Sequence, residues 1–567
     1  MTKDKSNFPD RDPPASTERS MPQFVDVVVV GAGFAGLYAH YKFRQIGLTA
    51  FGFEAAAEVG GTWYWNRYPG ARCDVESLDY AYSFSRKLLD EWKWSERFAT
   101  QPEILQYVNH VADRFDLRRD YAFQTKVVSG EFDEATNQWT VRTDRGDVLR
   151  CRYLVAAVGG LSVPKEPEIA GLKDFAGRWV QTGCWPHEPV EIEGKRVAVI
   201  GTGSSGIQCI PLLAQEAAQL TVFQRTPNFS VPAHNGPINP EYEARVRADY
   251  VEHHKRNRMT KGGVPPRINT GVSAMSVSEE KRCAKFEEAW GFGTFALQSV
   301  FSDTSSNPES NAAAAAFVHD KIRAIVKDPA LAEKLLPKTF PFGTKRLCLD
   351  TNYYATFNRD NVELVDIRET PIERITGTGI KTTGKEYPTD LIVFATGFDA
   401  VTGPLCALNL RSANGRLLQD VWRDGPQSYL GLMIAGFPNL FTVNGPSSPS
   451  VLANMLQTIE HHVDMIVDCV DHTEKNGFVR VEADEEAQIG WAHEVANMAE
   501  KTLYTKADSW YMGANVPGKP RVFLMYIGGL DRYVERCDVI VREGYLGFHF
   551  FSDLGAAAKG HDRTADV

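Results

Sequence analysis

Short apolar runs, each ending in a glycine turn, stand out from the pattern of apolar and polar positions along the chain. Val25–Val30 leads into the Gly-rich loop 31–36, and Arg196–Ile200 leads into a second such loop, 201–206. Each run has the length of a buried parallel strand, and each loop opens a helical pattern, which extends to about Ile46 and Leu220, respectively. A third run, 390–396, ends at Gly397 and predicts another buried strand.

The segment between residues 240 and 340 has a different character. It is charged and Ala-rich, as in Ala312–Lys327, and it lacks strand-like runs, so we expect a helical insertion. The last third mixes expected helices at Ser450–Val470 and Glu485–Lys501 with short strands. These patterns predict an α/β fold of two Rossmann-like dinucleotide-binding domains with a helical insertion.

The order of these patterns also predicts domain boundaries. We expect a disordered N-terminal tail at 1–21, which is polar and Pro-rich, and a discontinuous first dinucleotide-binding domain. The ranges are 22–160 and 390–567 for the first dinucleotide-binding domain, 161–234 and 341–389 for the second, and 235–340 for the insertion.

Composition narrows the class of partner. The 567 residues are 43% hydrophobic and 24% charged, which is typical of a globular protein, and the formal net charge of -10 disfavours nucleic acid and anionic membranes. No apolar stretch reaches the roughly 18 residues of a membrane span, and residues 1–21 lack the apolar segment of a signal peptide, so we expect neither feature. The nine cysteines form no C-x-x-C pair, so we expect free thiols, a cytoplasmic location and no metal centre.

The two Gly-rich loops predict two dinucleotide sites. In such a loop the first glycine permits the turn, the second lets the backbone approach a pyrophosphate, and the third lets the helix pack on the strand. The pyrophosphate then lies at a helix N-terminus, where free N–H groups favour an anion.

The residues after each following strand distinguish the two nucleotides. Glu54 follows the strand expected at residues 48–53, and a carboxylate there suits a free ribose 2′-hydroxyl, as in FAD. Arg225 and Thr226 follow the strand at 220–223, and they can bind a 2′-phosphate that a carboxylate would repel. This contrast predicts a flavoprotein that NADPH reduces.

Oxygen is the electron acceptor that remains for such a flavoprotein. Disulfide reductases need a reactive cysteine pair, and electron transferases need Fe–S or haem ligands, and the chain has neither pattern.

A further set of motifs resembles the type I Baeyer–Villiger monooxygenases. Residues 175–186 resemble the family fingerprint F-x-G-x-x-x-H-x-x-x-W-P through Phe175, Gly177, Trp185 and Pro186, but Gln181 replaces the histidine. Residues 60–74, 342–346, 395–399 and 509–511 also resemble the family in order and spacing, and the likeness runs from about residue 22 to 550. The change at Gln181 leaves two interpretations, a disabled enzyme or an adequate substitute, and we favour the second.

The resemblance implies a reaction and its catalytic residues. A hydrophobic ketone, O2 and NADPH would give an ester or lactone through a C4a-peroxyflavin. Arg346 matches the catalytic arginine, and Asp74 matches the aspartate that orients it beside the flavin. A guanidinium suits this role because it stays charged and donates several hydrogen bonds.

The remaining roles implied by the resemblance, together with the loop residues above, fall into three groups. FAD contacts are expected from Gly31, Ala32, Gly33, Phe34, Ala35, Gly36, Glu54, Thr62, Trp63, Tyr64, Trp65, Asp74, Tyr80 and Met455. NADPH contacts are expected from Arg72, Gly201, Thr202, Gly203, Ser204, Ser205, Gly206, Gln208, Arg225, Thr226, Lys345, Arg346 and Trp510. The substrate pocket is expected to include Cys73, Val75, Ser450, Val451 and Leu452.

Two alternatives remain open at this stage. One is a flavin N- or S-hydroxylating monooxygenase, which shares both loops but does not usually carry the fingerprint or this arginine. The other is a non-catalytic flavin- and NADPH-binding redox protein, against which the retained Arg346 and Asp74 argue. The identity of the ketone and the oligomeric state are not determined by these patterns.

Overall fold

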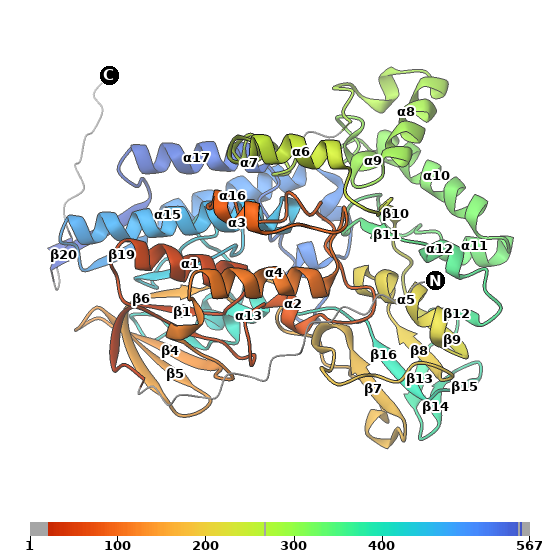
Figure 1. Ribbon diagram of the computed structural model, residues 1–567, viewed down its shortest axis with the longest axis horizontal. Helices are drawn as coiled ribbons and strands as arrows, with labels where there is room; N and C mark the ends of the chain where they lie inside the picture. Colours follow the sequence, from red (N-terminus) through yellow and green to blue (C-terminus); the bar gives the residue numbers. More distant parts are fainter. Residues whose placement is uncertain (1–20, 266–267, 554–555, 558–567) are drawn as a thin grey trace.

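A computed structural model describes residues 21–265, 268–553 and 556–557, so the predicted tail lies outside the described residues except for Met21. Two separate sheets form its frame (Figure 1). The first contains eight strands in the order β17-β4-β5-β6-β1-β2-β3, with β18 pairing with β6. Their bounds are β1 Phe24–Val30, β2 Ala50–Phe53, β3 Tyr121–Ala122, β4 Val127–Asp133, β5 Gln138–Thr143, β6 Val148–Ala156, β17 Leu410–Arg411 and β18 Leu440–Thr442.

The second sheet has five strands, all parallel, in the order β12-β9-β8-β16-β7. They are β7 Arg178–Gln181, β8 Arg196–Ile200, β9 Gln219–Gln224, β12 Val362–Asp366 and β16 Leu391–Phe394. One face packs against α5 (Ser204–Glu216), and the other packs against a small sheet of β13 Ile372–Ile375, β14 Gly379–Thr382 and β15 Glu386–Pro388. The predicted class, α/β with two dinucleotide-binding domains, is confirmed.

The predicted boundary at residue 390 is wrong by one strand. The sequence predicts that the buried run starting at Leu391 belongs to the first domain. In the structure this run is β16, which lies between β8 and β7 in the second sheet. Leu391 pairs with Val197 of β8 and with Arg178 of β7. A short apolar strand does not specify its neighbours, because pairing depends on contacts distant in sequence. The chain therefore returns to the first domain only after Phe394.

The predicted insertion is helical, and its described residues within 235–340 contain no strand. It is not a separate domain, because its helices are divided between two cores. Val246 of α6 (Pro240–Ala248) and Tyr250 of α7 (Tyr250–Arg258) pack with the first domain. The remaining helices pack with the second domain: α8 Glu279–Phe292, α9 Ala296–Ser299, α10 Pro308–Ile325 and α11 Pro329–Leu335.

The other elements complete the frame. The helices are α2 Thr62–Trp65, α3 Arg86–Glu91, α4 Gln101–Arg114, α12 Tyr353–Thr356, α13 Thr402–Cys406, α14 Leu418–Val421, α16 Glu485–Glu500 and α17 Leu530–Arg542. The short strands are β10 Ser230–Pro232, β11 Cys348–Asp350, β19 Arg480–Ala483, β20 Phe548–Asp553 and β21 Ala556–Ala557. Among the described residues, no helix is both long and apolar enough to cross a membrane.

Two predicted helix ends need correction. The helix expected from Ser450 begins at Met455 as α15 (Met455–Lys475), because Asn454 caps it by accepting a hydrogen bond from the Leu456 N–H. The helix expected to run to Leu220 is α5, which ends at Glu216, because the chain must turn before β9.

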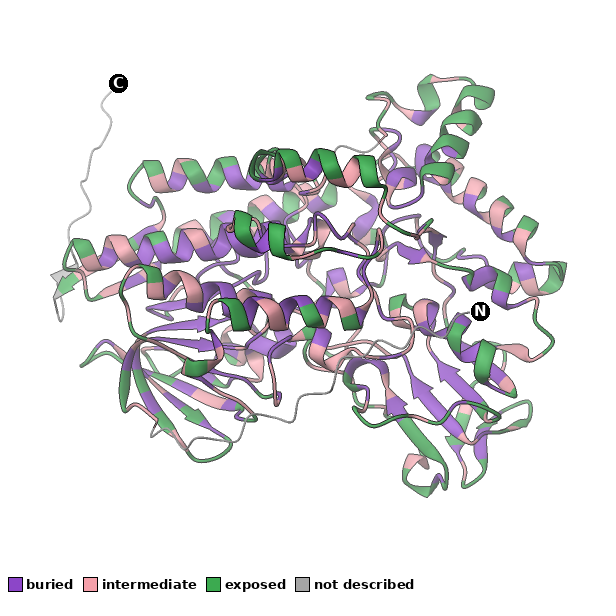
Figure 2. Cartoon of the chain, in the orientation of Figure 1, coloured by how far each residue is buried: buried purple, intermediate pink, exposed green. Residues whose placement is uncertain are grey.

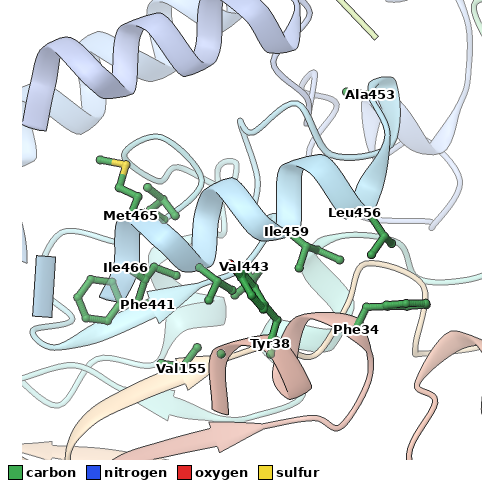
Figure 3. Packing of buried hydrophobic residues seen from close by; sticks show 14 of the residues in the cluster. Phe34, Tyr38, Val155, Phe441, Val443, Ala453, Leu456, Ile459, Met465 and Ile466 are labelled. Carbon is green, nitrogen blue, oxygen red and sulfur yellow. The ribbon is translucent and has the colours of Figure 1, made fainter. Parts of the chain in front are cut away.

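Helix α15 contributes many of the buried residues of the first-domain core. It lies against α1 (Phe34–Gln45), and Figure 3 shows its buried face packed near Phe34 and Tyr38. Figure 2 shows that the central strands β1, β8 and β16 and much of α15 are buried, whereas α8 keeps an exposed face. The packing of α15 on α1 therefore fixes the first Gly-rich loop, which opens α1, against the start of α15.

We expect Ile466→Ala on α15 to lower the free energy of unfolding by about 2–5 kcal/mol, because the truncated side chain leaves a cavity. Ile466 is 2% exposed in the first core. Urea unfolding of the FAD-loaded protein measures the effect. Leu546→Ala is the control, since Leu546 is 54% exposed and its truncation should cost less than about 0.5 kcal/mol. Equal costs for the two variants would contradict the packing described.

Candidate active site between the two domains

The first Gly-rich loop joins β1 to α1. Gly31 has φ +107°, and a Cβ there would lie 2.6 Å from the Ala157 carbonyl oxygen, so the position requires glycine. A Cβ on Gly36 would lie 1.7 Å from the Gly31 oxygen, which explains the close packing of α1 on the loop. Gly33 caps α1 without a side-chain acceptor, and the first turn carries no acidic residue, so its free N–H groups can receive an anion.

Glu54 lies at the end of β2 and is buried against this loop. Its two carboxylate oxygens accept hydrogen bonds from the Ala32 N–H at 2.6 Å and the Ala56 N–H at 2.8 Å. Burial raises the pKa of Glu54, and these backbone donors oppose the rise. The structure thus places Glu54 against the first Gly-rich loop.

The second Gly-rich loop repeats this geometry between β8 and α5. Gly201 has φ +114°, and Cβ atoms on Gly201 and Gly206 would lie 2.4 Å from the Ala395 and Gly201 carbonyl oxygens, respectively. A Cβ on Gly203 would meet nothing within 4 Å. The Thr202 hydroxyl donates to the Thr226 carbonyl at 3.0 Å, which ties the loop to the end of β9. The Ser204 and Ser205 hydroxyls contact Cys348 and Thr182, respectively.

Three cations gather beyond the end of β9. Arg225 and Lys345 were predicted here, and the structure adds Lys165, which lies on the linker that enters the second domain. Burial lowers the pKa of Lys345 and of Lys165, and repulsion from Arg225 lowers both further. None of the three forms an ion pair with a carboxylate of the described residues. Three unpaired cations on one edge fit a phosphate dianion.

Arg346 and Asp74 meet at the junction of the domains. The Nε and Nη2 of Arg346 donate to Asp74 Oδ2 at 3.0 and 2.6 Å, and Nη1 donates to the Val451 carbonyl at 2.5 Å. The guanidinium also lies over the ring of Phe295, 5.1 Å from its centroid. Burial alone would lower the pKa of Arg346, but the Asp74 carboxylate and the Tyr511 hydroxyl raise it.

Apolar and small residues surround this pair. Cys73 and Val75 flank Asp74 and are buried, and burial raises the pKa of the Cys73 thiol. Ser450, Val451 and Leu452 form a 3-10 turn in which Ser450 has φ +44°, an uncommon conformation for serine. The predicted pocket residues are therefore brought together around Arg346.

The other predicted FAD residues lie along the first loop. Helix α2 spans Thr62 to Trp65, and the preceding Gly61 lies so close to Gly33 that a Cβ on Gly33 would be 3.4 Å from the Gly61 Cα. The Trp63 indole donates to the Tyr80 hydroxyl at 3.2 Å. Met455 begins α15, whose cap residue Asn454 also donates to the Asp79 carbonyl at 2.8 Å.

Two residues predicted to contact NADPH, Arg72 and Gln208, have protein partners. Arg72 pairs with Glu96 at 2.9 Å and also donates to the Phe98 carbonyl. The Gln208 amide donates to the Arg72 carbonyl at 3.1 Å and accepts from the Tyr68 hydroxyl at 2.7 Å. In this structure both residues thus connect α5 to the first domain. Trp510 packs on Tyr511 with ring centroids 4.5 Å apart. Tyr511 in turn interacts with Arg346, so Trp510 lies close to the arginine.

The residues that resemble the fingerprint connect the two domains. Gln181 ends β7, donates to the Lys165 carbonyl at 2.8 Å and accepts from the Cys184 thiol at 3.4 Å. The Trp185 N–H donates to the Trp65 carbonyl of α2 at 3.1 Å, just before Pro186. Phe175 is buried beside Gly177, where a Cβ would lie 2.5 Å from the Asp390 oxygen. The Gln181 side chain thus joins the end of β7 to the linker at Lys165.

Sequence reasoning missed three residues of this site: Lys165, Phe295 and Tyr511. Tyr511 belongs to the stretch 509–511 that resembles the family, and this resemblance is a signal that could have identified it. Lys165 and Phe295 lie in a linker and in the insertion, where no local pattern distinguishes them. All nine cysteines are free, and no group of three or more possible metal ligands occurs in the described part of the chain.

Comparison with known proteins places these features in a family. Residues 28–264 match the family model described as pyridine nucleotide-disulphide oxidoreductase. A "Baeyer-Villiger monooxygenase" from Pseudooceanicola batsensis is 42% identical, covering 92% of this chain and 95% of that protein. A "Phenazine N-monooxygenase" from Lysobacter antibioticus is 41% identical over 93% of this chain and 97% of that protein. The solved structure "Oxidized steroid monooxygenase bound to NADP" is 51% identical, covers 94% of this chain and 100% of that one, and has a TM-score of 0.89.

We expect Gly203→Ala to weaken NADP+ binding by about tenfold or more, because the added methyl takes the space through which the backbone approaches a pyrophosphate. The substitution should cost less than about 1 kcal/mol of stability, since the methyl meets no protein atom. Gly206→Ala is the contrast, because its methyl collides with the Gly201 carbonyl and should lower the unfolding midpoint as well. Nucleotide titration and thermal unfolding of both variants separate the two effects.

We expect Gln181→His to remain active and Gln181→Ala to weaken NADPH use more than FAD binding, because only the alanine loses the hydrogen bond to Lys165. The wild type should also lack the pH dependence that a titrating histidine would add. Steady-state kinetics from pH 6 to 9 on the three forms tests this. Turnover by the histidine form alone would identify Gln181 as a disabling change.

Proposed function

The chain belongs to the Baeyer–Villiger monooxygenases, which are FAD- and NADPH-dependent enzymes, and from this premise we propose that it inserts one oxygen atom of O2 beside the carbonyl of a hydrophobic ketone. The product is an ester or a lactone. The observation that carries the proposal is the Arg346–Asp74 pair, which lies where the two domains meet, next to the buried Cys73 and Val75.

The first domain has the features that FAD requires. The pyrophosphate is proposed to lie at the N-terminus of α1, with Glu54 at the ribose and α2, Trp63 and Tyr80 along the flavin. Met455 and the start of α15 are proposed to face the flavin ring, where a helix N-terminus stabilises negative charge. Bound FAD supplies the two-electron chemistry, accepting hydride from NADPH and activating O2.

The second domain has the features that NADPH requires. The N-terminus of α5 is proposed to receive the pyrophosphate, and Arg225, Thr226 and Lys345 the 2′-phosphate. Trp510 is proposed to contact the nicotinamide half. Arg72 and Gln208 are proposed to support this site indirectly, through the interdomain hydrogen bonds that they make.

Arg346 is the proposed catalytic residue. Its guanidinium has five N–H donors, of which three bind Asp74 and Val451 and a further one lies within hydrogen-bonding reach of the Tyr511 hydroxyl, so one donor is left for the reacting oxygen atoms. The group cannot act as an acid at working pH, because its pKa is raised further by Asp74. It can therefore stabilise an oxyanion without protonating it. Asp74 holds the plane of the guanidinium fixed through two hydrogen bonds to one oxygen.

The predicted pocket residues are proposed to select the ketone by its shape and its apolar character. Cys73, Val75, Ser450, Val451 and Leu452 supply no charged group, which supports a hydrophobic ketone of the aryl, cyclic, long-chain or steroid class. The similarity to a steroid monooxygenase supports a bulky ring ketone as the first compound to test. The free thiols support a reducing cytoplasm as the proposed location.

N-oxidation is the second candidate function, and the N-monooxygenase relative is the observation that favours it. Purified FAD-loaded protein is mixed with NADPH, ¹⁸O2 and either a ketone panel or an aromatic nitrogen heterocycle such as phenazine. Labelled ester or lactone, with ketone-dependent NADPH consumption, supports the main proposal. Labelled N-oxide alone supports the second candidate, and NADPH consumption without a labelled product contradicts both.

We expect Arg346→Ala to lower ester formation by about 10²–10³-fold, because the proposed oxyanion donors are lost. FAD should stay bound and NADPH should still reduce it, since the charge is required for the oxygenation step. Gas chromatography measures ester formation, and the bleaching of the flavin absorbance under anaerobic conditions measures reduction of FAD by NADPH. Arg346→Lys is the matched control that keeps the charge but not the planar fork, and should retain little activity. Ester formation near the wild-type rate in Arg346→Ala would rule out the assigned role.

A further inference from the structure

We propose that Lys165 recognises the 2′-phosphate of the bound nucleotide and couples its binding to the order of the loop 513–522, which follows Trp510. The proposal adds a specificity residue to the NADPH site. Three observations support it: the hydrogen bonds that fix the Lys165 backbone, the position of its ammonium group near Arg225, and the ammonium donors that have no acceptor among the described residues.

The backbone of Lys165 is held at the nucleotide edge of the second sheet. Its N–H donates to the Gly397 carbonyl at 3.0 Å, just beyond β16, and its own carbonyl accepts from Gln181 at the end of β7. Arg225 follows β9 in the same parallel sheet. Because the carboxyl ends of parallel strands share one edge, and ligands bind there, these bonds place Lys165 on the same edge as Arg225.

Among the described residues, the ammonium of Lys165 has one protein acceptor, the Asn515 carbonyl at 2.7 Å. An ammonium has three donors, so two remain for a ligand. Repulsion from Arg225 adds to burial in lowering the pKa of Lys165, and Lys345 experiences the same two effects. A phosphate dianion placed among these three cations would relieve the repulsion and accept the remaining donors.

The same ammonium also holds the loop. Asn515 is the loop residue that accepts from Lys165, and its side chain donates to the Phe398 carbonyl at 2.7 Å, next to the linker that returns to the first domain. A phosphate that keeps Lys165 charged and in place therefore keeps this loop anchor in place. A nucleotide that lacks the phosphate leaves Arg225 repelling both Lys165 and Lys345.

The chain offers a matched control in Lys519. This lysine anchors the same loop by pairing with Asp399, and it donates to the Thr402 hydroxyl at 2.7 Å. It contributes no repulsion to Lys165 or Lys345. Its removal should loosen the loop without affecting recognition of the 2′-phosphate.

The test uses the FAD-loaded protein with NADP+ and NAD+, which differ only in the 2′-phosphate. Flavin absorbance titrations give the two dissociation constants, and hydrogen–deuterium exchange of the peptide that covers 513–522, at saturating nucleotide, reports loop order. The variants are Lys165→Met, Lys165→Gln and Lys519→Met, with Arg225→Ala as the reference for a lost phosphate contact.

In the wild type we expect NADP+ to protect the loop from exchange more than NAD+ does. In Lys165→Met and Lys165→Gln we expect the NADP+ to NAD+ affinity ratio to fall about tenfold, with NAD+ affinity within twofold, and the extra protection by NADP+ to disappear. Lys519→Met should raise loop exchange with both nucleotides and keep the affinity ratio within twofold.

Three results would overturn the proposal. One is an unchanged affinity ratio in the Lys165 variants, and another is equal weakening of NADP+ and NAD+. The third is full retention of the extra NADP+ protection at saturation, which would separate the phosphate from the loop. These measurements do not depend on oxygenation, so they are distinguishable from a failure of the proposed ketone chemistry.

Discussion

A single cation held at the boundary between two domains is the constraint on which the rest of the structure depends. Arg346 enters from the second domain, whereas Asp74 and Val451, which fix its guanidinium, belong to the first. The ion pair is part-exposed, with Arg346 at 23% and Asp74 at 29% side-chain exposure, so its Coulomb energy alone is modest. Its geometry therefore depends on how firmly the two domains are held together.

The domains are joined by directional hydrogen bonds as well as by the packing of Tyr68, Ala71 and Phe98 into the second core. The Gln208 amide joins α5 to Arg72 and Tyr68, and the Trp185 N–H joins the fingerprint to α2. Each bond fixes an angle as well as a distance, but exchanges readily with water when the domains separate. Such an interface holds a defined alignment and still permits the relative motion by which one site can serve hydride transfer and then oxygenation.

Local patterns predicted those parts of the molecule that local physics determines. The Gly-rich loops, their flanking strands and the identities of Glu54 and Arg225 follow from turn sterics and charge within about 30 residues. The sheet to which β16 belongs depends on its pairing with residues nearly 200 positions away, and the sequence order favoured the wrong domain. Lys165 and Phe295 were missed for the same reason: each reaches the site through contacts that no nearby residue specifies.

The helical insertion covers one face of the Arg346 guanidinium with the ring of Phe295. Phe295 comes from the segment that precedes α9, whose neighbours pack into the second core, while α6 and α7 of the same insertion pack into the first. An aromatic face over a guanidinium favours the cation and keeps water from that side. Arg346 thus has Asp74 at its edge, a backbone carbonyl at one nitrogen and a ring against its plane. Lysine has no planar group that could meet all three requirements, so the surroundings themselves specify arginine.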